Sequence, residues 1–301
     1  MRDPALASLS DLPDDRPVLI AGPTASGKSA LALRIAQTRG GVVVNADALQ
    51  VWSCWRVLTA RPSAADEGAA PHALYGHVAP GRSYSVGDWL AEVAAILRAA
   101  ARGGPRPIII GGTGLYLTAL TRGLAVIPPV PPEIRIAGDA LLAEPDGLAR
   151  MVAGLDPRTA AGIDLCNPAR VQRAWEVLRA TGRGLADWQA ETPAPLVPPE
   201  SALRLLITAD RDWLADRIAR RFALMMAAGA LDEVRAALPH WQPGAQWIRA
   251  IGAPELAAHL RGETTLDAAI ERAVIATRQY AKSQRIWFRG RMQDWQPVAA
   301  G

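Results

Sequence analysis

The stretch GPTASGKS, Gly22 to Ser29, constrains the fold of this chain more than any other feature of its sequence. It matches the pattern G-x-x-x-x-G-K-[ST] in full. The apolar run PVLIA precedes it, and SALALRIAQ follows with helical spacing. A strand, a glycine loop and a helix in this order hold phosphate groups with backbone N–H groups and the positive helix end. We therefore expect a phosphate-binding loop, in which Lys28 supplies a positive charge and Ser29 a hydroxyl for Mg²⁺.

Strand patterns alternate with helical patterns beyond this loop. Apolar runs at 42–46, 107–110 and 204–209 indicate three further buried strands. Helices are expected at 88–102 and 210–227, with Asp88 and Asp210 as their N-caps. Such alternation predicts a parallel sheet with helices on both faces, and hence an α/β fold with a P-loop NTPase-like core.

Two proline clusters interrupt the α/β pattern, IPPVPPE at 127–133 and PAPLVPPE at 193–200. Proline-rich segments are stiff and extended, which suits linkers. The residues between them show helical patterns and no strand pattern. We predict a core domain formed by 1–122 and 201–301, and a mostly helical insertion domain at 123–200.

Composition narrows the class of protein. The two cysteines, Cys54 and Cys166, form neither a disulfide framework nor a zinc motif. The first fifteen residues lack the apolar run of a signal peptide, and no stretch is long enough to span a membrane. We expect a soluble, cytoplasmic, monomeric protein without a membrane partner, and a short flexible tail ahead of Pro17. The formal charge of +4 weakly favours an anionic partner.

Two acidic residues follow predicted strands, where a nucleoside triphosphatase would need a magnesium ligand. Asp210 follows LLITA and is placed to cap the next helix. Asp47 follows VVVNA, and the next residues, ALQVW, do not begin a clear helix. Because parallel sheets bind substrates at their carboxyl edge, we expect Asp47 to face a substrate.

A basic stripe is predicted near the end of the chain. Arg278, Lys282, Arg285 and Arg289 are spaced by four, three and four residues, which places them on one helical face. The segment 271–291 holds six basic residues and one acidic residue. Such a face suits the phosphate backbone of a nucleic acid, and RNA contact is the favoured interpretation.

These motifs occur in a fixed order with several others: NADALQV (45–51), TARPS (59–63), YSVGDW (84–89), GGTGLY (111–116), ARVQRAWEVLRATGR (169–183), DRIARRF (216–222) and TRQYAKSQRIWFRG (277–290). Together they resemble the tRNA dimethylallyltransferase family, also called tRNA isopentenyltransferases, from about Pro17 to Gly290. The phosphate loop alone is shared by many families, whereas its combination with GGTGLY and the terminal segment is specific.

The resemblance implies transfer of a dimethylallyl group from dimethylallyl diphosphate to the N6 amine of the adenine 3′ of the anticodon, with release of pyrophosphate. It implies Mg²⁺ at Ser29 and tRNA, through its anticodon stem-loop, as the partner. It also implies Asp47 as general base, with Thr24 and Arg221 at the reacting centre. The implied diphosphate-binding residues are Gly22, Pro23, Thr24, Ala25, Ser26, Gly27, Lys28, Ser29 and Arg221. The implied tRNA-binding residues are Asp47, Ala48, Leu49, Gln50, Thr113, Arg135, Ala169, Arg170, Val171, Gln172, Arg173, Lys282, Ser283, Gln284, Arg285, Ile286, Trp287, Phe288 and Arg289.

The chain departs from the family pattern at several places. Ala48 stands where the family usually has serine, and Ala253, in IGAPE, stands where it has tyrosine. The run WRVLTARP corresponds to a family run like GMDIGTAKP, with Arg61 in place of the lysine. The turn DLCNP lacks the histidine of the family pattern. Three other functions stay open at this point: a small-molecule kinase using ATP, a prenyltransferase acting on free AMP or ATP, and a non-catalytic RNA-binding protein. The kinase does not explain the basic stripe, and the binding protein does not explain Lys28 with Asp47.

Overall fold

The structure, a computed structural model, describes residues 16–300 and divides into two compact units. Within the described residues, one unit comprises 16–121 and 197–300, and the other 122–196. Apart from Arg16, the tail expected ahead of Pro17 lies outside the described residues. No helix among residues 16–300 is long and apolar enough to cross a membrane.

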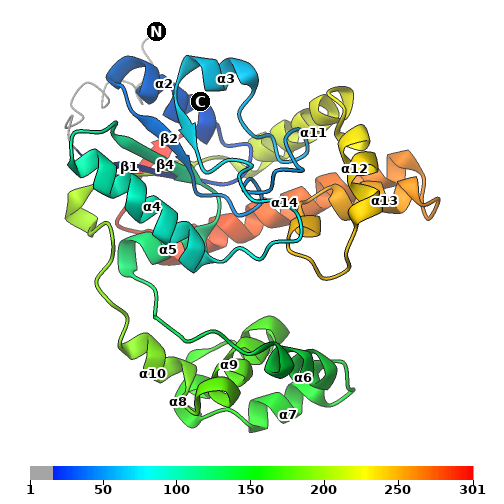
Figure 1. Ribbon diagram of the computed structural model, residues 1–301. Helices are drawn as coiled ribbons and strands as arrows, with labels where there is room; N and C mark the ends of the chain where they lie inside the picture. Colours follow the sequence, from blue (N-terminus) through cyan, green and yellow to red (C-terminus); the bar gives the residue numbers. More distant parts are fainter. Residues whose placement is uncertain (1–15, 301) are drawn as a thin grey trace. The chain divides into compact units, whose positions relative to one another are not determined.

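The first unit is built on a sheet of six parallel strands (Figure 1). The strands are β1 (Val18–Ala21), β2 (Val42–Asn45), β3 (His72–Ala73), β4 (Pro107–Gly111), β5 (Leu203–Thr208) and β6 (Gln296–Ala299). Their order is β3-β2-β4-β1-β5-β6, and every neighbouring pair is parallel. The predicted α/β class and its four buried strands are confirmed. The edge strands β3 and β6 carry no apolar run, and the sequence did not predict them.

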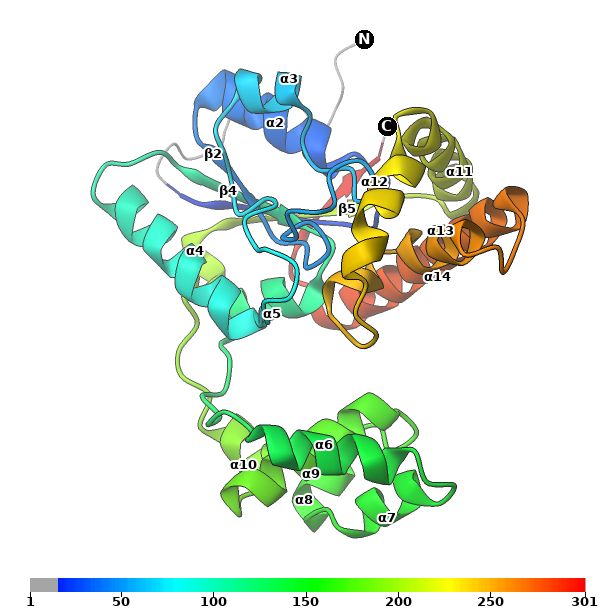
Figure 2. The ribbon, with the colours of Figure 1, turned by 45° about the vertical axis from the view of Figure 1, so that its right-hand side comes forward.

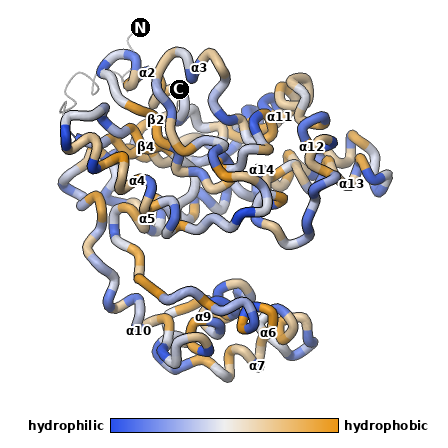
Figure 3. Tube along the Cα trace, in the orientation of Figure 1, coloured by the Kyte–Doolittle hydropathy of each residue, from blue (hydrophilic) through white to orange (hydrophobic). Residues whose placement is uncertain are grey.

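Alternation along the strands gives the sheet two apolar faces. Ile20 packs with Ile35 on one face, whereas its neighbour Leu19 packs with Trp89 and Leu117 on the other. Figure 2 shows helices on both sides of the sheet. They are α2 (Lys28–Arg39) and α3 (Ala64–Ala69) on one side, and α4 (Val86–Ala101), α5 (Gly114–Arg122) and the end of α14 (Leu266–Arg291) on the other. The apolar colours of β2 and β4 in Figure 3 reflect this burial from both faces.

A separate helical core lies beside the sheet within the same unit. It involves α11 (Arg211–Ala227), α12 (Ala230–Ala237), α13 (Ala253–Leu260), the first half of α14 and two short 3₁₀ helices, Leu238–His240 and Trp247–Arg249. A third 3₁₀ helix, Pro199–Ser201, precedes β5. Trp55, Phe222 and Trp247 are buried in it, and the Trp55 indole N–H donates to the Trp247 carbonyl at 2.7 Å. This core supplies one wall of the site described below.

The helix caps bear out one sequence prediction and correct another. Asp210 is the N-cap of α11, and its carboxylate accepts the N–H groups of Asp212 and Trp213. Asp88 is not the N-cap of α4, because that helix begins at Val86 and Ser85 caps it. Asp88 instead occupies the third helical position and accepts the Ser85 N–H, which completes a capping box.

The second unit contains only helices among its regular elements. They are α6 (Pro132–Leu142), α7 (Gly147–Ala153), α8 (Pro157–Gly162), α9 (Pro168–Thr181) and α10 (Leu185–Ala190). Met151, Val171 and Trp175 form its small buried core. Asn167 caps α9, and Pro168 follows at the first helical position, where the missing N–H costs no hydrogen bond.

Candidate active site

The glycine loop joins β1 to α2 and turns sharply as it does so. Gly27 has φ +93° and Ala25 φ +63°, both in the left-handed region. Helix α2 begins immediately afterwards at Lys28, so its free N–H groups open toward the loop. The Lys28 ammonium donates to the Pro23 carbonyl at 2.7 Å and thereby crosses the loop. Backbone donors, a helix end and a cation thus converge, which is the arrangement that binds phosphate oxygens.

A pocket of about 860 Å³, open solvent included, adjoins this loop. Its polar lining comes from the loop, from the segment after β2, and from α11 and α14. Thr24, Lys28, Ser29, Asp47, Gln50, Thr59, Arg221, Thr277 and Tyr280 form that polar part. The remaining wall is mainly apolar and includes Leu49, Leu58, Ile110, Ile218, Phe222, Met225 and Ile251. The pocket therefore offers both charged groups and apolar surface to one ligand.

Charged groups are concentrated at the loop end of the pocket. The Arg221 guanidinium donates to Thr24 Oγ1 at 3.3 Å, and Arg217 Nε donates to the Ala25 carbonyl at 3.0 Å. Burial lowers the pKa of Lys28 to about 8, while Asp47 acts in the opposite direction and Arg221 adds to the decrease. Burial also lowers the pKa of Arg221, again opposed by Asp47. The two cations and the carboxylate therefore lie close enough to influence one another.

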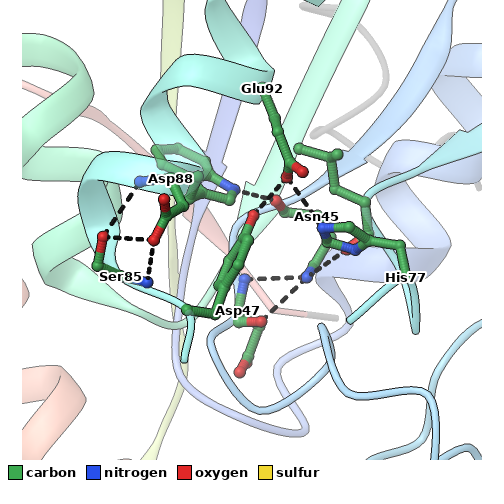
Figure 4. A network of polar contacts seen from close by, with 9 residues as sticks. Asn45, Asp47, His77, Ser85, Asp88 and Glu92 are labelled. Carbon is green, nitrogen blue, oxygen red and sulfur yellow. Dashed lines mark hydrogen bonds and ion pairs between the residues drawn. The ribbon is translucent and has the colours of Figure 1, made fainter. Parts of the chain in front are cut away.

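Asn45 fixes the main chain on which Asp47 is carried (Figure 4). Its side-chain oxygen accepts the Asp47 N–H at 2.9 Å, and its amide group donates to the Asp47 and Leu74 carbonyls, each at 3.0 Å. Asp47 Oδ1 accepts the Leu49 N–H at 3.0 Å. Asn45 is fully buried, and its own carbonyl accepts the Trp89 indole N–H at 2.7 Å. The backbone at the carboxyl end of β2 is held on both sides of the carboxylate.

A second polar group lies beside this turn in Figure 4. Glu92 Oε2 accepts the Tyr84 hydroxyl at 2.5 Å and lies 2.9 Å from His77 Nε2. The His77 and Tyr84 rings meet edge to face at 5.4 Å. These contacts join the loop that follows β3 to α4, the same helix whose Trp89 donates to the Asn45 carbonyl.

Gln284 of α14 connects two loops at the floor of the site. Its side-chain oxygen accepts the Thr24 N–H at 2.8 Å, and its amide donates to the Gly112 carbonyl at 2.9 Å. Gly112 has no room for a side chain, since a Cβ there would lie 2.1 Å from Gln284 Nε2 and 3.4 Å from Asp47 Oδ2. Thr113 Oγ1 accepts the Ala48 N–H at 2.9 Å. Thr113 of the GGTG turn is thus hydrogen-bonded to the segment after β2. Gln284 connects the phosphate loop to the same turn through its two side-chain hydrogen bonds.

The residues expected to bind RNA on α14 fall into two groups. Lys282, Ser283, Ile286 and Arg289 are exposed, and Arg285 is half-buried. Gln284 is 4% exposed and Phe288 2% exposed, and Phe288 belongs to the core under the sheet. Trp287 is partly buried against the same core. The side chains of Gln284 and Phe288 face the protein interior, whereas the exposed face of the helix is open to a partner such as RNA.

The segment Asp47–Gln50 has a similar division. Leu49 and Gln50 line the pocket, and the Gln50 amide donates to the carbonyls of Thr59 and Ala60 at 2.8 and 3.1 Å. Ala48 is partly buried and gives its N–H to Thr113. Leu49 and Gln50 therefore form part of the pocket wall, and Ala48 connects this segment to Thr113.

The remaining expected contacts lie in the second unit. Arg135 on α6 is exposed, and so are Ala169 and Arg170 in the first turn of α9. Arg173 is half-buried, and burial lowers its pKa, with Arg135 close enough to contribute. Val171 is fully buried in the core of the unit.

Gln172, also named for RNA contact, is bound to two carboxylates, since its amide donates to Asp139 at 2.6 Å and to Glu176 at 3.1 Å. Among the RNA contacts expected in this unit, the cations are Arg135, Arg170 and Arg173, which are exposed or half-buried.

The residue set at the loop fits Mg²⁺ in its chemistry. Among residues 16–300, no cluster of three or more His, Cys, Asp or Glu side chains could form an all-protein metal cage. Mg²⁺ does not require one, because it is usually held by one or two protein oxygens together with phosphate oxygens and water. Ser29 is exposed at the start of α2 and lines the pocket that Asp47 also lines.

Comparisons with known proteins identify the family of this chain. The family model described as IPP transferase matches residues 50–291, and one described as isopentenyl transferase matches 16–68. A tRNA dimethylallyltransferase of Paracoccus denitrificans is 67% identical over 302 residues, which cover 100% of this chain and 99% of the relative. One of Cereibacter sphaeroides is 66% identical over 293 residues, covering 97% and 92%.

Solved structures are similar over nearly the whole chain. A full-length tRNA isopentenylpyrophosphate transferase of Bacillus halodurans has 29% identity and a TM-score of 0.68, and the match covers 95% of this chain and 90% of that one. A eukaryotic dimethylallyltransferase described as acting on tRNA has 25% identity and a TM-score of 0.79, with 94% and 73% covered. This chain therefore belongs to the IPP transferase family, the family of the tRNA dimethylallyltransferases.

Proposed function

We propose that this protein transfers the dimethylallyl group of dimethylallyl diphosphate to the N6 amine of the adenine 3′ of the anticodon in tRNA, and releases pyrophosphate. One observation carries the proposal. The phosphate loop and the Asp47 carboxylate face a single pocket whose remaining wall is mainly apolar. A prenyl diphosphate needs an anion site joined to a hydrocarbon site, and the lining of this pocket supplies both.

The chemistry follows from this placement. The lone pair of the adenine nitrogen attacks C1 of the donor, the C1–O bond breaks, and its electron pair leaves with the diphosphate. Negative charge grows on the leaving group, where the loop N–H groups, Lys28 and Arg221 stabilise the transition state more than the ground state. The attacking nitrogen loses a proton to Asp47, from which it passes to solvent. We expect Thr24, a loop residue whose hydroxyl accepts a hydrogen bond from Arg221, to contact the reacting centre.

Magnesium would be held by Ser29 together with oxygens of the bound diphosphate. When bound, it supplies charge neutralisation for the leaving group. Ser29, Lys28 and the loop N–H groups orient the diphosphate, and Gln284 holds the loop in the conformation that does so.

The proposed binding of RNA is supported by the exposed cations of α14 and of the second unit. Lys282 and Arg289 are exposed, and Arg285 is half-buried on the same face. Phosphate contacts from such residues position a nucleic acid without reading its sequence. An adenine in an anticodon loop reaches Asp47 only after it leaves its stack, and a base in a single-stranded loop does so at low cost.

The discriminating experiment measures transfer of labelled dimethylallyl from its diphosphate to an anticodon stem-loop RNA, with AMP and with radiolabelled ATP in parallel. We expect label on the RNA, none on AMP and no phosphate release from ATP. Label on AMP alone would support a free-nucleotide prenyltransferase, and phosphoryl transfer from ATP would support a kinase.

Asp47→Asn is the matched variant for this assay. Asparagine keeps an oxygen that can accept the Leu49 N–H, so the turn survives while the base is lost. We expect kcat to fall by at least about 10² with RNA affinity unchanged, because general-base catalysis contributes about 10²–10⁴. Wild-type turnover in this variant would remove Asp47 from the mechanism.

A further inference from the structure

Two side chains from separate parts of the chain close the apolar end of the pocket. Leu58 and Phe222 both line it, and they are only 3% and 4% exposed. They meet above Gly252, where a Cβ would lie 2.9 Å from Leu58 Cδ1 and 3.1 Å from Phe222 Cε2. The buried rings of Trp55 and Trp247 belong to the same core. The pocket therefore ends at a packed wall in this direction.

Helix α11 leads from the phosphate loop to that wall. Arg217 donates to the Ala25 carbonyl and Arg221 to Thr24, both in the loop. Phe222 and Met225 follow on the pocket side of the same helix. Arg221 and Met225 are separated by about 6 Å along the helix axis, since an α-helix rises ~1.5 Å per residue. A donor whose diphosphate lies on the loop has a short hydrocarbon space beyond Arg221 before it meets the wall.

Leu58 is held in place by a carboxylate that the reaction does not use. Glu233 of α12 accepts three successive backbone N–H groups: Oε1 accepts those of Arg56 and Val57 at 2.5 and 3.0 Å, and Oε2 that of Leu58 at 2.8 Å. Hydrogen bonds to a charged acceptor are about twice as strong as neutral ones. Leu58 belongs to the run WRVLTARP, which is one of those in which the chain departs from its family pattern.

We infer that Leu58, held by Glu233, limits the prenyl donor to five carbons. The inference rests on the proposed function, because it concerns the hydrocarbon part of the same substrate. A ten-carbon donor would have to push Leu58 or Phe222 into a core that is already close-packed, and such cores resist added volume. Glu233 prevents the alternative, a retreat of the loop that carries Leu58. Leu58 is thus a specificity-determining residue, and Glu233 is its positioning residue.

The test compares geranyl diphosphate with dimethylallyl diphosphate as donors to the same anticodon stem-loop, as a ratio of kcat/KM values. We expect Leu58→Ala to shift this ratio toward geranyl by at least about tenfold, because one methylene in an apolar pocket discriminates by about 10–200-fold. Leu58→Val, which removes less volume, is expected to give a smaller shift in the same direction. Val57→Ala is the matched control, since Val57 is adjacent but does not line the pocket.

Glu233→Gln tests the positioning role separately. Its –NH2 group cannot accept an N–H, unlike the carboxylate oxygen that it replaces, so at least one of the three backbone hydrogen bonds is lost and the hold on Leu58 is weakened without altering Leu58 itself. We expect the donor ratio to shift toward geranyl, as with Leu58→Ala, whereas a purely structural role would lower both activities equally. Variants that fold by circular dichroism, use dimethylallyl diphosphate and keep the wild-type ratio would overturn the inference. Absence of dimethylallyl transfer by the wild type would instead refute the proposed function.

Discussion

Replacement of Gln284 by alanine separates the role implied by sequence resemblance from the role found in the structure. The resemblance assigns Gln284 to RNA contact, whereas the structure buries it between the phosphate loop and the GGTG turn. Gln284→Ala leaves the Thr24 N–H and the Gly112 carbonyl without their partner. Each buried polar group left unsatisfied costs about 1–3 kcal/mol, so we expect the free energy of unfolding to fall by about 2–6 kcal/mol.

Urea unfolding followed by circular dichroism measures this loss, with Gln279→Ala as the control. Gln279 is an exposed glutamine on the same helix, and its replacement should change the free energy of unfolding by less than about 0.5 kcal/mol. The affinity of folded Gln284→Ala for the stem-loop RNA should stay at the wild-type value. Equal stability of the two variants, or a loss of RNA affinity without a loss of stability, would refute the reasoning.

Three further predictions concern the same site. Asn45→Ala removes the three side-chain hydrogen bonds around the Asp47 turn. We expect kcat to fall by about 10–10²-fold with the donor KM unchanged, because the variant disturbs the orientation of Asp47 and not the diphosphate site. Equal changes in kcat and KM would contradict this role of Asn45. Lys28, with a pKa of about 8, is protonated below that pH and loses its charge above it. An anionic ligand favours the protonated form, so binding of a non-reactive donor analogue at about pH 8.5 should be coupled to proton uptake. Calorimetry in two buffers with different ionisation enthalpies measures this uptake, and its absence would contradict the prediction. Replacing Arg285 and Arg289 by alanine should reduce the salt dependence of log K for RNA by roughly one to two units, and an unchanged slope would place the stripe outside the interface.

Much of the core could be predicted because its signals are local. The phosphate loop, four buried strands and the cap at Asp210 follow from short patterns, and the structure contains them. Asp88 was assigned to the wrong cap position because serine and aspartate three residues apart are both capping residues, and only the backbone shows which one precedes the helix. The edge strands β3 and β6 could not be predicted, because they are short and carry no apolar run.

The part of the site that the sequence did not predict depends on long-range contacts. Gln284 meets Thr24 across 260 residues and Glu233 meets Leu58 across 175, so no spacing rule connects either pair. Phe288 is buried, because a helix that presents cations to solvent buries its opposite face, and the motif runs over both faces. Asn45 is not predicted as a site residue from the sequence. Its hydrogen bonds to Asp47 are local, but they matter for the site only because Asp47 lines the pocket, which the sequence does not show.

The most direct test of the central claim is a crystal structure with a non-reactive analogue of dimethylallyl diphosphate and an anticodon stem-loop. The account predicts the diphosphate on the N–H groups of the loop with Lys28 and Arg221 beside it, the hydrocarbon against Leu58, and an extruded adenine whose N6 lies between C1 and the Asp47 carboxylate. A donor bound outside this pocket, or an Asp47 side chain directed away from the adenine, would contradict it.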